Sequence, residues 1–256
     1  MTWQPVDCHA HSTFSDGALT VPQIAERGVE LGVRPSVSDH ISRDVARSIT
    51  SIDEVSMYLD ELERHEVLRG GEFCWHDSLW RELPDTLTSR FTHRIGSLHA
   101  IALPDGRLVH AFSRRLPDGL TVDRYMDAHA DALQRFAREM PVDILAHPTL
   151  VALPFRAAAV DELWTEERET RLVDALFGAG IAFEISSRYT PHERLVRRAV
   201  ERGVRISLGS DGHTREQVAN ISGPLALARA AGVADEDLYD PDRHGSKTGR
   251  HSRTRT

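Results

Sequence analysis

Residues 5–11 read Pro-Val-Asp-Cys-His-Ala-His, a short apolar segment that ends in two histidines. Because side chains alternate faces along a β-strand, we expect His9 and His11 to project the same way, with Asp7 behind them. Two imidazoles at this spacing can chelate one metal ion, but an isolated pair can also arise by coincidence on a surface. The rest of the chain has to decide between these interpretations.

Short blocks of histidines and carboxylates recur along the chain. They are Ser15-Asp16-Gly17, Ser38-Asp39-His40, Gly71-Glu72, Ser97-Leu98-His99, Ala146-His147-Pro148 and Ser210-Asp211-Gly212-His213. Asp211 and His213 repeat the two-residue spacing of the first pair. Nitrogen and oxygen ligands in this number suit several divalent metal ions, provided that the fold brings the blocks together. The sequence therefore predicts a multinuclear metallohydrolase.

Predicted strands and helices alternate along most of the chain. We expect strands at residues 5–9, 34–38, 67–73, 93–98, 142–146, 181–185 and 204–208. We expect amphipathic helices at 21–31, 52–66, 122–140, 161–178, 191–202 and 215–231, four of them followed by Gly32, Gly180, Gly203 and Gly232 as C-cap residues. This alternation favours an α/β barrel and leaves an open doubly wound sheet as the alternative. In both architectures the functional face lies at the carboxyl ends of the strands, where the blocks fall.

Two segments depart from the alternation. Residues 101–112 carry a Pro-Asp-Gly turn between apolar stretches and predict a β-hairpin beside the site. Residues 240–256 are basic and almost free of apolar side chains, so we expect a disordered tail after a domain at 1–239.

Composition narrows the class of protein further. The chain has 256 residues, 31 basic and 39 acidic, for a formal charge of −8. This balance makes nucleic acid an unlikely partner but is compatible with a small anionic substrate, because bound metal ions add local positive charge. The chain has two cysteines, no basic and apolar leader, and no long apolar run. We therefore expect a cytoplasmic protein that does not engage a membrane, and we expect no disulfide framework.

Several of the candidate ligands have a structural alternative. Asp16 could cap a turn or a helix, Glu72 could be an ion-pair partner, and His99 or His147 could be hydrogen-bonded structural residues. Asp39 could orient the imidazole of the neighbouring ligand as an outer partner. Trp75, His76, Asp77 and Trp80 could form a substrate wall or could pack locally under a loop.

Taken in order, the blocks resemble the motifs of the polymerase and histidinol phosphatase (PHP) superfamily, over about residues 6–230. The resemblance implies a distorted (β/α)7 barrel, similar to a TIM barrel, with three zinc, iron or manganese ions at the carboxyl mouth of its strands. It assigns residues 1–239 to a PHP metallophosphoesterase domain. The implied metal ligands are His9, His11, Asp16, His40, Glu72, His99, His147, Asp211 and His213.

The resemblance also implies how the ligands divide among the three ions. His9, His11, Glu72 and Asp211 would hold one ion, Glu72 would bridge to a second held by His99 and His147, and Asp16, His40 and His213 would hold the third. Two departures are mild: Ser38 stands where threonine is common, and Gly212 where alanine is common. Neither departure removes a ligand.

By resemblance the activity is metal-dependent phosphomonoester hydrolysis by a metal-activated hydroxide, with Glu72, Asp211 and His213 as catalytic residues. Residues 91–99, 143–150 and 208–213 resemble the histidinol-phosphatase branch, which cleaves histidinol phosphate to histidinol and phosphate in histidine biosynthesis. Arg156 and Arg188 follow predicted strand ends and are candidates for phosphate binding, although each could also be a solvated surface arginine.

Three alternatives remain open at this point. The protein could be a phosphoesterase or phosphodiesterase that acts on nucleotides or short oligonucleotides. It could be a non-catalytic, metal-stabilised binding module, although an intact ligand set argues against this. Metal-dependent hydrolysis of a carbon–nitrogen or carboxylic ester bond would favour a lysine at a strand end, yet the chain's single lysine, Lys247, lies in the tail.

Overall fold

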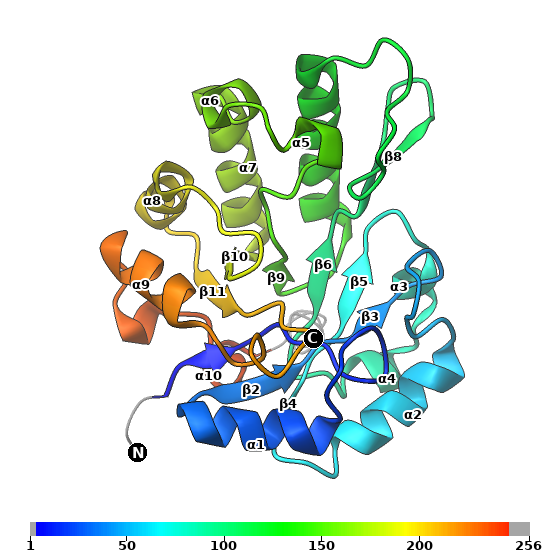
Figure 1. Ribbon diagram of the computed structural model, residues 1–256, viewed down its shortest axis with the longest axis vertical. Coiled ribbons are helices and arrows are strands. Elements are labelled where there is room, and N and C mark those ends of the chain that lie inside the picture. The colour runs from blue at the N-terminus through cyan, green and yellow to red at the C-terminus, as the bar shows by residue number, and fades with distance from the viewer. Residues whose placement is uncertain (1–3, 246–256) are drawn as a thin grey trace, which may run out of the picture.

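A ring of parallel strands organises the protein (Figure 1). The computed structural model describes residues 4–245. One three-stranded sheet has the order β1-β2-β4, and one six-stranded sheet has the order β11-β10-β9-β6-β5-β3. The strands are β1 (Val6–Asp7), β2 (Arg34–Val37), β3 (His40–Ile41), β4 (Leu68–Arg69), β5 (Glu72–Cys74), β6 (Ile95–Ser97), β9 (Ile144–Leu145), β10 (Ala182–Ser186) and β11 (Ile206–Gly209).

The two sheets close into one barrel. β2 continues into β3, and β4 continues into β5. Each pair therefore acts as one interrupted strand of the barrel, with its first part in the three-stranded sheet and its second part in the six-stranded sheet. At the other seam the backbone amide of Cys8 donates to Leu208 O, and that of His11 donates to Gly212 O, both at 2.9 Å. The result is a distorted (β/α)7 barrel, as predicted, and the alternative of an open doubly wound sheet is excluded.

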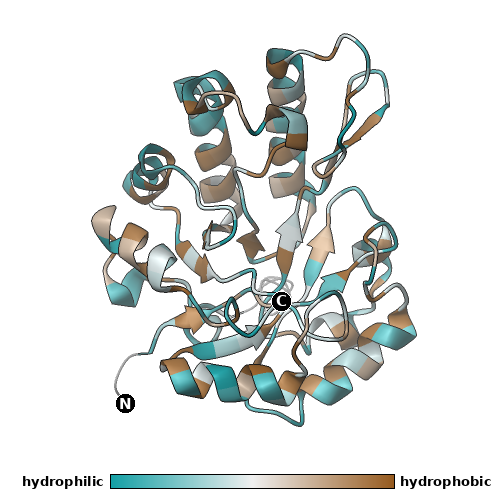
Figure 2. Cartoon of the chain, viewed as in Figure 1, coloured by the Kyte–Doolittle hydropathy of each residue, from teal (hydrophilic) through white to brown (hydrophobic). Residues whose placement is uncertain are grey.

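Helices surround the strands on the outside (Figure 1). The long ones are α1 (Val21–Leu31), α2 (Ile52–Leu62), α5 (Val122–Glu139), α7 (Glu166–Ala179), α8 (Glu193–Arg202) and α9 (Ser222–Ala230). The short ones are α3 (Leu79–Glu82), α4 (Asp85–Thr88), α6 (Val160–Leu163) and α10 (Pro241–His244). Apolar and polar residues mix along each long helix (Figure 2). One side of each helix packs on the core, as in α1, where Val21 and Ile24 are buried while Val29 is exposed.

Several predicted boundaries differ from the structure. The strand predicted at 67–73 is interrupted at Gly70, and the helix predicted at 161–178 is two helices because the Thr165 hydroxyl accepts the Arg168 amide and caps α7. The helix predicted at 215–231 begins only at Ser222, after a turn. β3 was not predicted. The predicted hairpin is confirmed as antiparallel β7 (Ala100–Ala102) and β8 (Leu108–His110).

The C-terminal segment is ordered for longer than predicted. Residues 240–245 belong to the described structure and include α10, and Arg34 forms ion pairs with Asp240 at 2.9 Å and with Asp242. The predicted disordered tail is therefore wrong for these residues, and its remainder at 246–256 lies outside the described residues. Among residues 4–245, no helix combines the length and apolar character needed to cross a membrane.

Candidate metal centre

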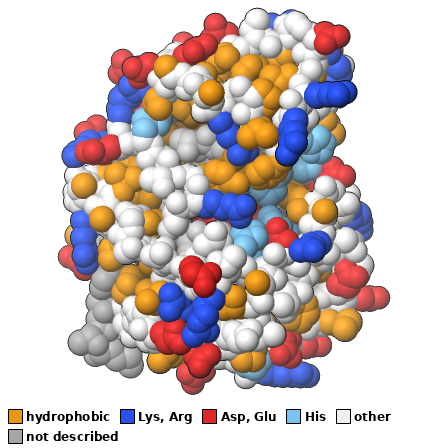
Figure 3. All heavy atoms as spheres, viewed as in Figure 1, with side chains coloured by type: hydrophobic (Ala, Val, Ile, Leu, Met, Phe, Trp, Pro, Cys, Tyr) orange, Lys and Arg blue, Asp and Glu red, His pale blue; other side chains and the backbone are white. Residues whose placement is uncertain are grey.

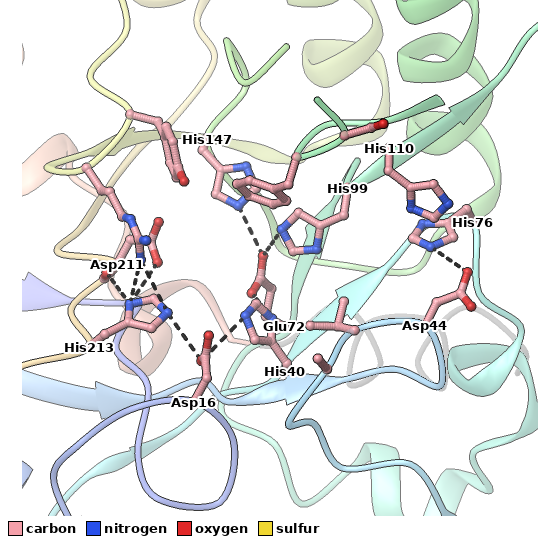
Figure 4. A pocket seen from close by; sticks show the side chains of 16 residues that line it. Asp16, His40, Asp44, Glu72, His76, His99, His110, His147, Asp211 and His213 are labelled. Carbon is pink, nitrogen blue, oxygen red and sulfur yellow. Dashed lines mark hydrogen bonds and ion pairs between the residues drawn. The ribbon is translucent and has the colours of Figure 1, made fainter. Parts of the chain in front are cut away.

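The barrel brings all nine predicted ligands to one mouth. Figure 4 shows seven of them facing each other around the cavity: Asp16, His40, Glu72, His99, His147, Asp211 and His213. The reason is that parallel strands end on the same side, so residues that follow different strands become neighbours. Figure 3 shows histidine side chains gathered in a hollow of this face, beside carboxylates and arginines. The ligands come from the ends of β1, β6, β9 and β11, from the starts of β3 and β5, and from the loop before α1.

Three overlapping groups of side chains are close enough to hold metal ions, with ligand atoms within 4.8 Å of one another. The groups are His11, Asp16, His40 and His213; His9, His11 and Asp211; and His40, Glu72 and His99. The ninth ligand, His147, joins them because its Nε2 lies 3.1 Å from Glu72 Oε1. The set predicted from the sequence is thus assembled in full.

The three groups of ligands overlap, whereas the resemblance implied that each of His11 and His40 binds a single ion. His40 stands between two of them: its Nδ1 lies 2.6 Å from Glu72 Oε2, and its Nε2 lies 3.7 Å from Asp16 Oδ1. His11 is likewise shared, with Nε2 at 3.3 Å from Asp211 Oδ1. Which ligand holds which ion stays a prediction.

Buried polar atoms without hydrogen-bond partners test whether the residues fit metal ions. His11 Nδ1, Asp16 Oδ1, His40 Nδ1 and Glu72 Oε2 are all buried, and none makes a hydrogen bond of good geometry with another described residue. Buried polar atoms are normally satisfied, because an unpaired one costs free energy. Four such atoms on mutually facing ligand side chains are the arrangement expected for cation coordination, so the residues fit divalent ions.

The pKa values of Glu72, His11 and His99 agree with that fit, whereas those of His9 and His40 are raised. Burial opposes the charge of Glu72, but the histidines around it, His40 foremost, hold its pKa well below the usual range. Burial, with the neighbouring imidazoles, lowers the pKa of His11, and burial lowers that of His99 to about 3. Metal binding needs an ionised carboxylate and neutral imidazoles. Burial opposes protonation of His9 and His40, but Glu184 raises the pKa of His9 and Glu72 that of His40, so these two imidazoles would release protons when metal binds.

Glu184, in the middle of β10, supports the centre and was missed from the sequence. Its side chain is fully buried; Oε1 lies 2.8 Å from His9 Nδ1, and Oε2 accepts the His147 amide at 2.6 Å. It therefore fixes one ligand ring and one ligand backbone. The sequence did hold a signal, because an acid inside an apolar strand is rarely buried without a partner.

Two aspartates brace the loops that carry the ligands. Asp39 accepts the amide and hydroxyl of Ser12 and the hydroxyl of Ser15, so it holds the loop between His11 and Asp16. The expectation that Asp39 orients the His40 ring is therefore wrong, because both of its oxygens accept hydrogen bonds from Ser12 and Ser15 instead.

Asp7 braces the opposite side. Its carboxylate accepts the amide and hydroxyl of Ser210 and the amide of Ala219, which ties the first strand to the loop after β11. Burial raises the pKa of Asp7 to about 6, although these hydrogen bonds oppose the shift.

Backbone geometry at two ligands is unusual. His147 and Asp211 have positive φ angles of 32° and 49°, which are uncommon for residues other than glycine. The Asp211 amide is held by His9 O at 2.7 Å. Such conformations persist where the surroundings enforce them, and they are typical of functional sites.

The departure at Gly212 has a steric reason in this chain. A Cβ on Gly212 would lie 2.6 Å from the amide nitrogen of Val218. The turn before α9 therefore packs directly against this glycine, and alanine would push it away.

The two candidate phosphate-binding arginines differ in placement. Arg188 lines the cavity, with Nη1 2.9 Å from His213 Nδ1. Arg156 donates from Nε and Nη2 to the carbonyls of Val151 and Ala111, each at 3.0 Å. Its guanidinium also packs against aromatic rings of the cavity wall. A role in phosphate binding stays a prediction for both.

Two solved protein structures have a similar fold. The fold is similar to that of a candidate histidinol phosphatase, HisK, from Listeria monocytogenes, with 13% sequence identity, a TM-score of 0.72, and coverage of 86% of this chain and 99% of that one. It is also similar to histidinol phosphate phosphatase from Lactococcus lactis subsp. lactis Il1403, solved with zinc, L-histidinol and phosphate, with 16% identity, a TM-score of 0.69, and coverage of 91% and 95%.

A curated protein matches in sequence as well. The DNA polymerase/3'-5' exonuclease PolX of Bacillus subtilis is 24% identical over 235 residues, which cover 87% of this chain. This chain spans only 36% of the length of that protein. No family model matches the sequence. The chain therefore has the fold of these two solved proteins, and its strand ends carry the ordered histidine and carboxylate motifs described above.

Proposed function

We propose that this protein is a metal-dependent phosphomonoesterase with histidinol phosphate as its preferred substrate and histidinol and phosphate as its products. One observation carries the proposal: seven of the nine ligand-capable side chains line one cavity of about 400 Å³, and the other two, His9 and His11, lie against Glu72 and Asp211. A cavity of this size suits a small substrate. Similarity in fold to a histidinol phosphate phosphatase solved with histidinol and phosphate supports the choice of substrate.

The charges of the site suit a phosphate dianion. Three zinc, iron or manganese ions at the three groups would outweigh the three carboxylates; they would lower the pKa of water and stabilise negative charge on phosphoryl oxygens. Arg188, at the edge of the cavity, can add a guanidinium to the same oxygens. Burial opposes the charge of Glu72, but the histidines around it hold its pKa well below the usual range, which suits a bridging metal ligand better than a proton donor.

Hydrolysis forms a bond between a water oxygen and phosphorus and breaks the bond from phosphorus to the alcohol oxygen. The leaving alkoxide needs a proton, and this proton comes in the proposed mechanism from the Asp211–His213 side of the site. His213 Nε2 lies 3.2 Å from Asp16 Oδ1, while its Nδ1 lies 2.9 Å from Asp211 O. These contacts hold the ring at the cavity, where it is partly accessible.

Phosphate release by the manganese- or zinc-loaded protein tests the proposal. We expect kcat/KM for histidinol phosphate to exceed that for generic phosphomonoesters and nucleotides by a hundredfold or more, about 2.7 kcal/mol of transition-state discrimination. Similar slow turnover of all compounds would reject histidinol phosphate while retaining a phosphoesterase. No phosphate release from any compound would reject both.

A second candidate is phosphodiester hydrolysis of nucleotides or short oligonucleotides. The observation that favours it is the sequence match to a protein described as a polymerase and exonuclease. Release of nucleotides from a short oligonucleotide, faster than phosphate release from histidinol phosphate, would support this alternative.

A further inference from the structure

The cavity at the metal centre has a second end that carries none of the predicted metal ligands. Asp44, His76 and His110 line it, and Figure 4 shows them together on the opposite side of the cavity from Asp211 and His213. The lining also includes Val45, Ala46, Phe112 and Ser113. A molecule whose phosphate sits on the metal side would extend toward this end.

The Asp44 carboxylate lacks a cationic partner from an arginine or a lysine. Its side chain is 51% exposed and lies at the cavity. The adjacent Arg43 is engaged elsewhere, because its two terminal nitrogens each lie 2.7 Å from an oxygen of Glu82. Within residues 4–245 no arginine or lysine forms an ion pair with Asp44. Its negative charge therefore remains available to a ligand.

His76 lies against this carboxylate without neutralising it. The His76 side chain is only 4% exposed, with Nε2 3.0 Å from Asp44 Oδ2. Neither of its ring nitrogens makes a well-aligned hydrogen bond with another described residue. The His110 ring meets the His76 ring edge-on, with centroids 5.6 Å apart. Burial lowers the pKa of His76, so the imidazole is neutral near pH 7 and leaves the carboxylate charge in place.

The two ends of the cavity thus have opposite polarity. Metal ions and Arg188 would attract a phosphate at one end, while Asp44 presents a carboxylate at the other. We propose that Asp44, positioned by His76, binds an ammonium group on the alcohol portion of the substrate. This inference rests on the proposed phosphomonoesterase function and assigns the side chain that would recognise the amino group of an amino-alcohol phosphate such as histidinol phosphate. A charge-assisted hydrogen bond between an ammonium and a carboxylate is stronger than a neutral one, so it can select such substrates.

Matched substrates test the proposal. Manganese-loaded protein is assayed with aminoalkyl phosphates of increasing chain length, each paired with the alkyl phosphate in which a methyl group replaces the ammonium. We expect the wild type to prefer the ammonium compound of at least one pair by tenfold or more in kcat/KM. We expect Asp44→Asn to reduce that ratio about tenfold, mainly through KM, because a binding contact is lost.

Two further variants serve as a control and as a test of the role of His76. Asp53→Asn, which changes an exposed acid on α2, should keep the wild-type ratio. His76→Phe, which keeps a buried ring but removes both nitrogens, should lower the ratio through KM.

Three outcomes overturn the inference. An absence of ammonium preference in the wild type, or a wild-type ratio in Asp44→Asn, rejects the carboxylate as the recognition group while leaving phosphomonoester hydrolysis intact. A wild-type ratio in His76→Phe rejects the positioning role. Failure to hydrolyse either member of any pair instead rejects the proposed function itself.

Discussion

Replacing Glu184 by glutamine should weaken metal binding although this residue is not a predicted ligand. The carboxylate accepts from two sides: His9 Nδ1 lies 2.8 Å from Oε1, and the His147 amide lies 2.6 Å from Oε2. When Nδ1 carries the proton, Nε2 of His9 presents its lone pair toward Glu72 and His11 in the metal centre. In Glu184→Gln one carboxylate oxygen becomes an amide nitrogen, which is a donor. Either His9 Nδ1–H or the His147 backbone N–H then faces this donor and loses its acceptor.

The expected size of the effect follows from these two contacts. Leaving one buried donor unsatisfied costs about 1–3 kcal/mol. Loss of a partner that orients a metal ligand typically weakens metal affinity about 10–100-fold, or roughly 1.4–2.7 kcal/mol. The first range is the cost of an unsatisfied buried donor and the second is a loss of metal-binding free energy, and the two are similar in size. Gly209→Ala should have a similar effect, because its Cβ would lie 2.1 Å from Glu184 Oε1 and must displace the carboxylate.

Competition with a chromogenic chelator measures the zinc affinity of each variant, and thermal unfolding reports on the fold. Glu201→Gln, an exposed acid of α8, is the matched control and should bind metal as the wild type does. Wild-type zinc affinity in both Glu184→Gln and Gly209→Ala would refute the supporting role of this carboxylate.

Three other predictions concern separate parts of the molecule. Glu72→Ala should lose bound metal and at least ~100-fold in activity with an unchanged circular dichroism spectrum, checked by elemental analysis and phosphate release. Burial opposes ionisation of Glu169, but hydrogen bonds from Arg194 and His192 outweigh it and lower its pKa below 4.5. Its carboxylate therefore stabilises the fold above pH 4.5 and progressively less as the pH falls. Urea unfolding should find Glu169→Gln about 2 kcal/mol less stable at neutral pH, with a smaller deficit in acid. Gly212→Ala should lower the melting temperature by displacing the turn before α9, and a wild-type value would contradict that packing.

Local patterns in the sequence were enough to predict which candidate ligands follow strand ends, and much of the secondary structure. α1 has the predicted boundaries, Val21–Leu31, and ends at Gly32 with a left-handed φ of 65°. Amphipathic periodicity and a C-cap glycine are properties of neighbouring residues, so they can be read without the fold. The break between α6 and α7 was less visible, because a helical pattern continues across Thr165 while the cap depends on its side-chain rotamer.

The sequence by itself determined which residue types could bind metal and that they would follow strand ends, because ligand chemistry and strand alternation are written locally. Only the tertiary structure decided how these residues meet. Closure of the barrel places Glu184 behind His9, 175 positions away, and turns Asp39 toward Ser12 instead of toward its neighbour His40. It also gathers Asp44 and His76 at the far end of the cavity. Contacts of this kind depend on the register and curvature of the whole barrel, which no short stretch of sequence specifies.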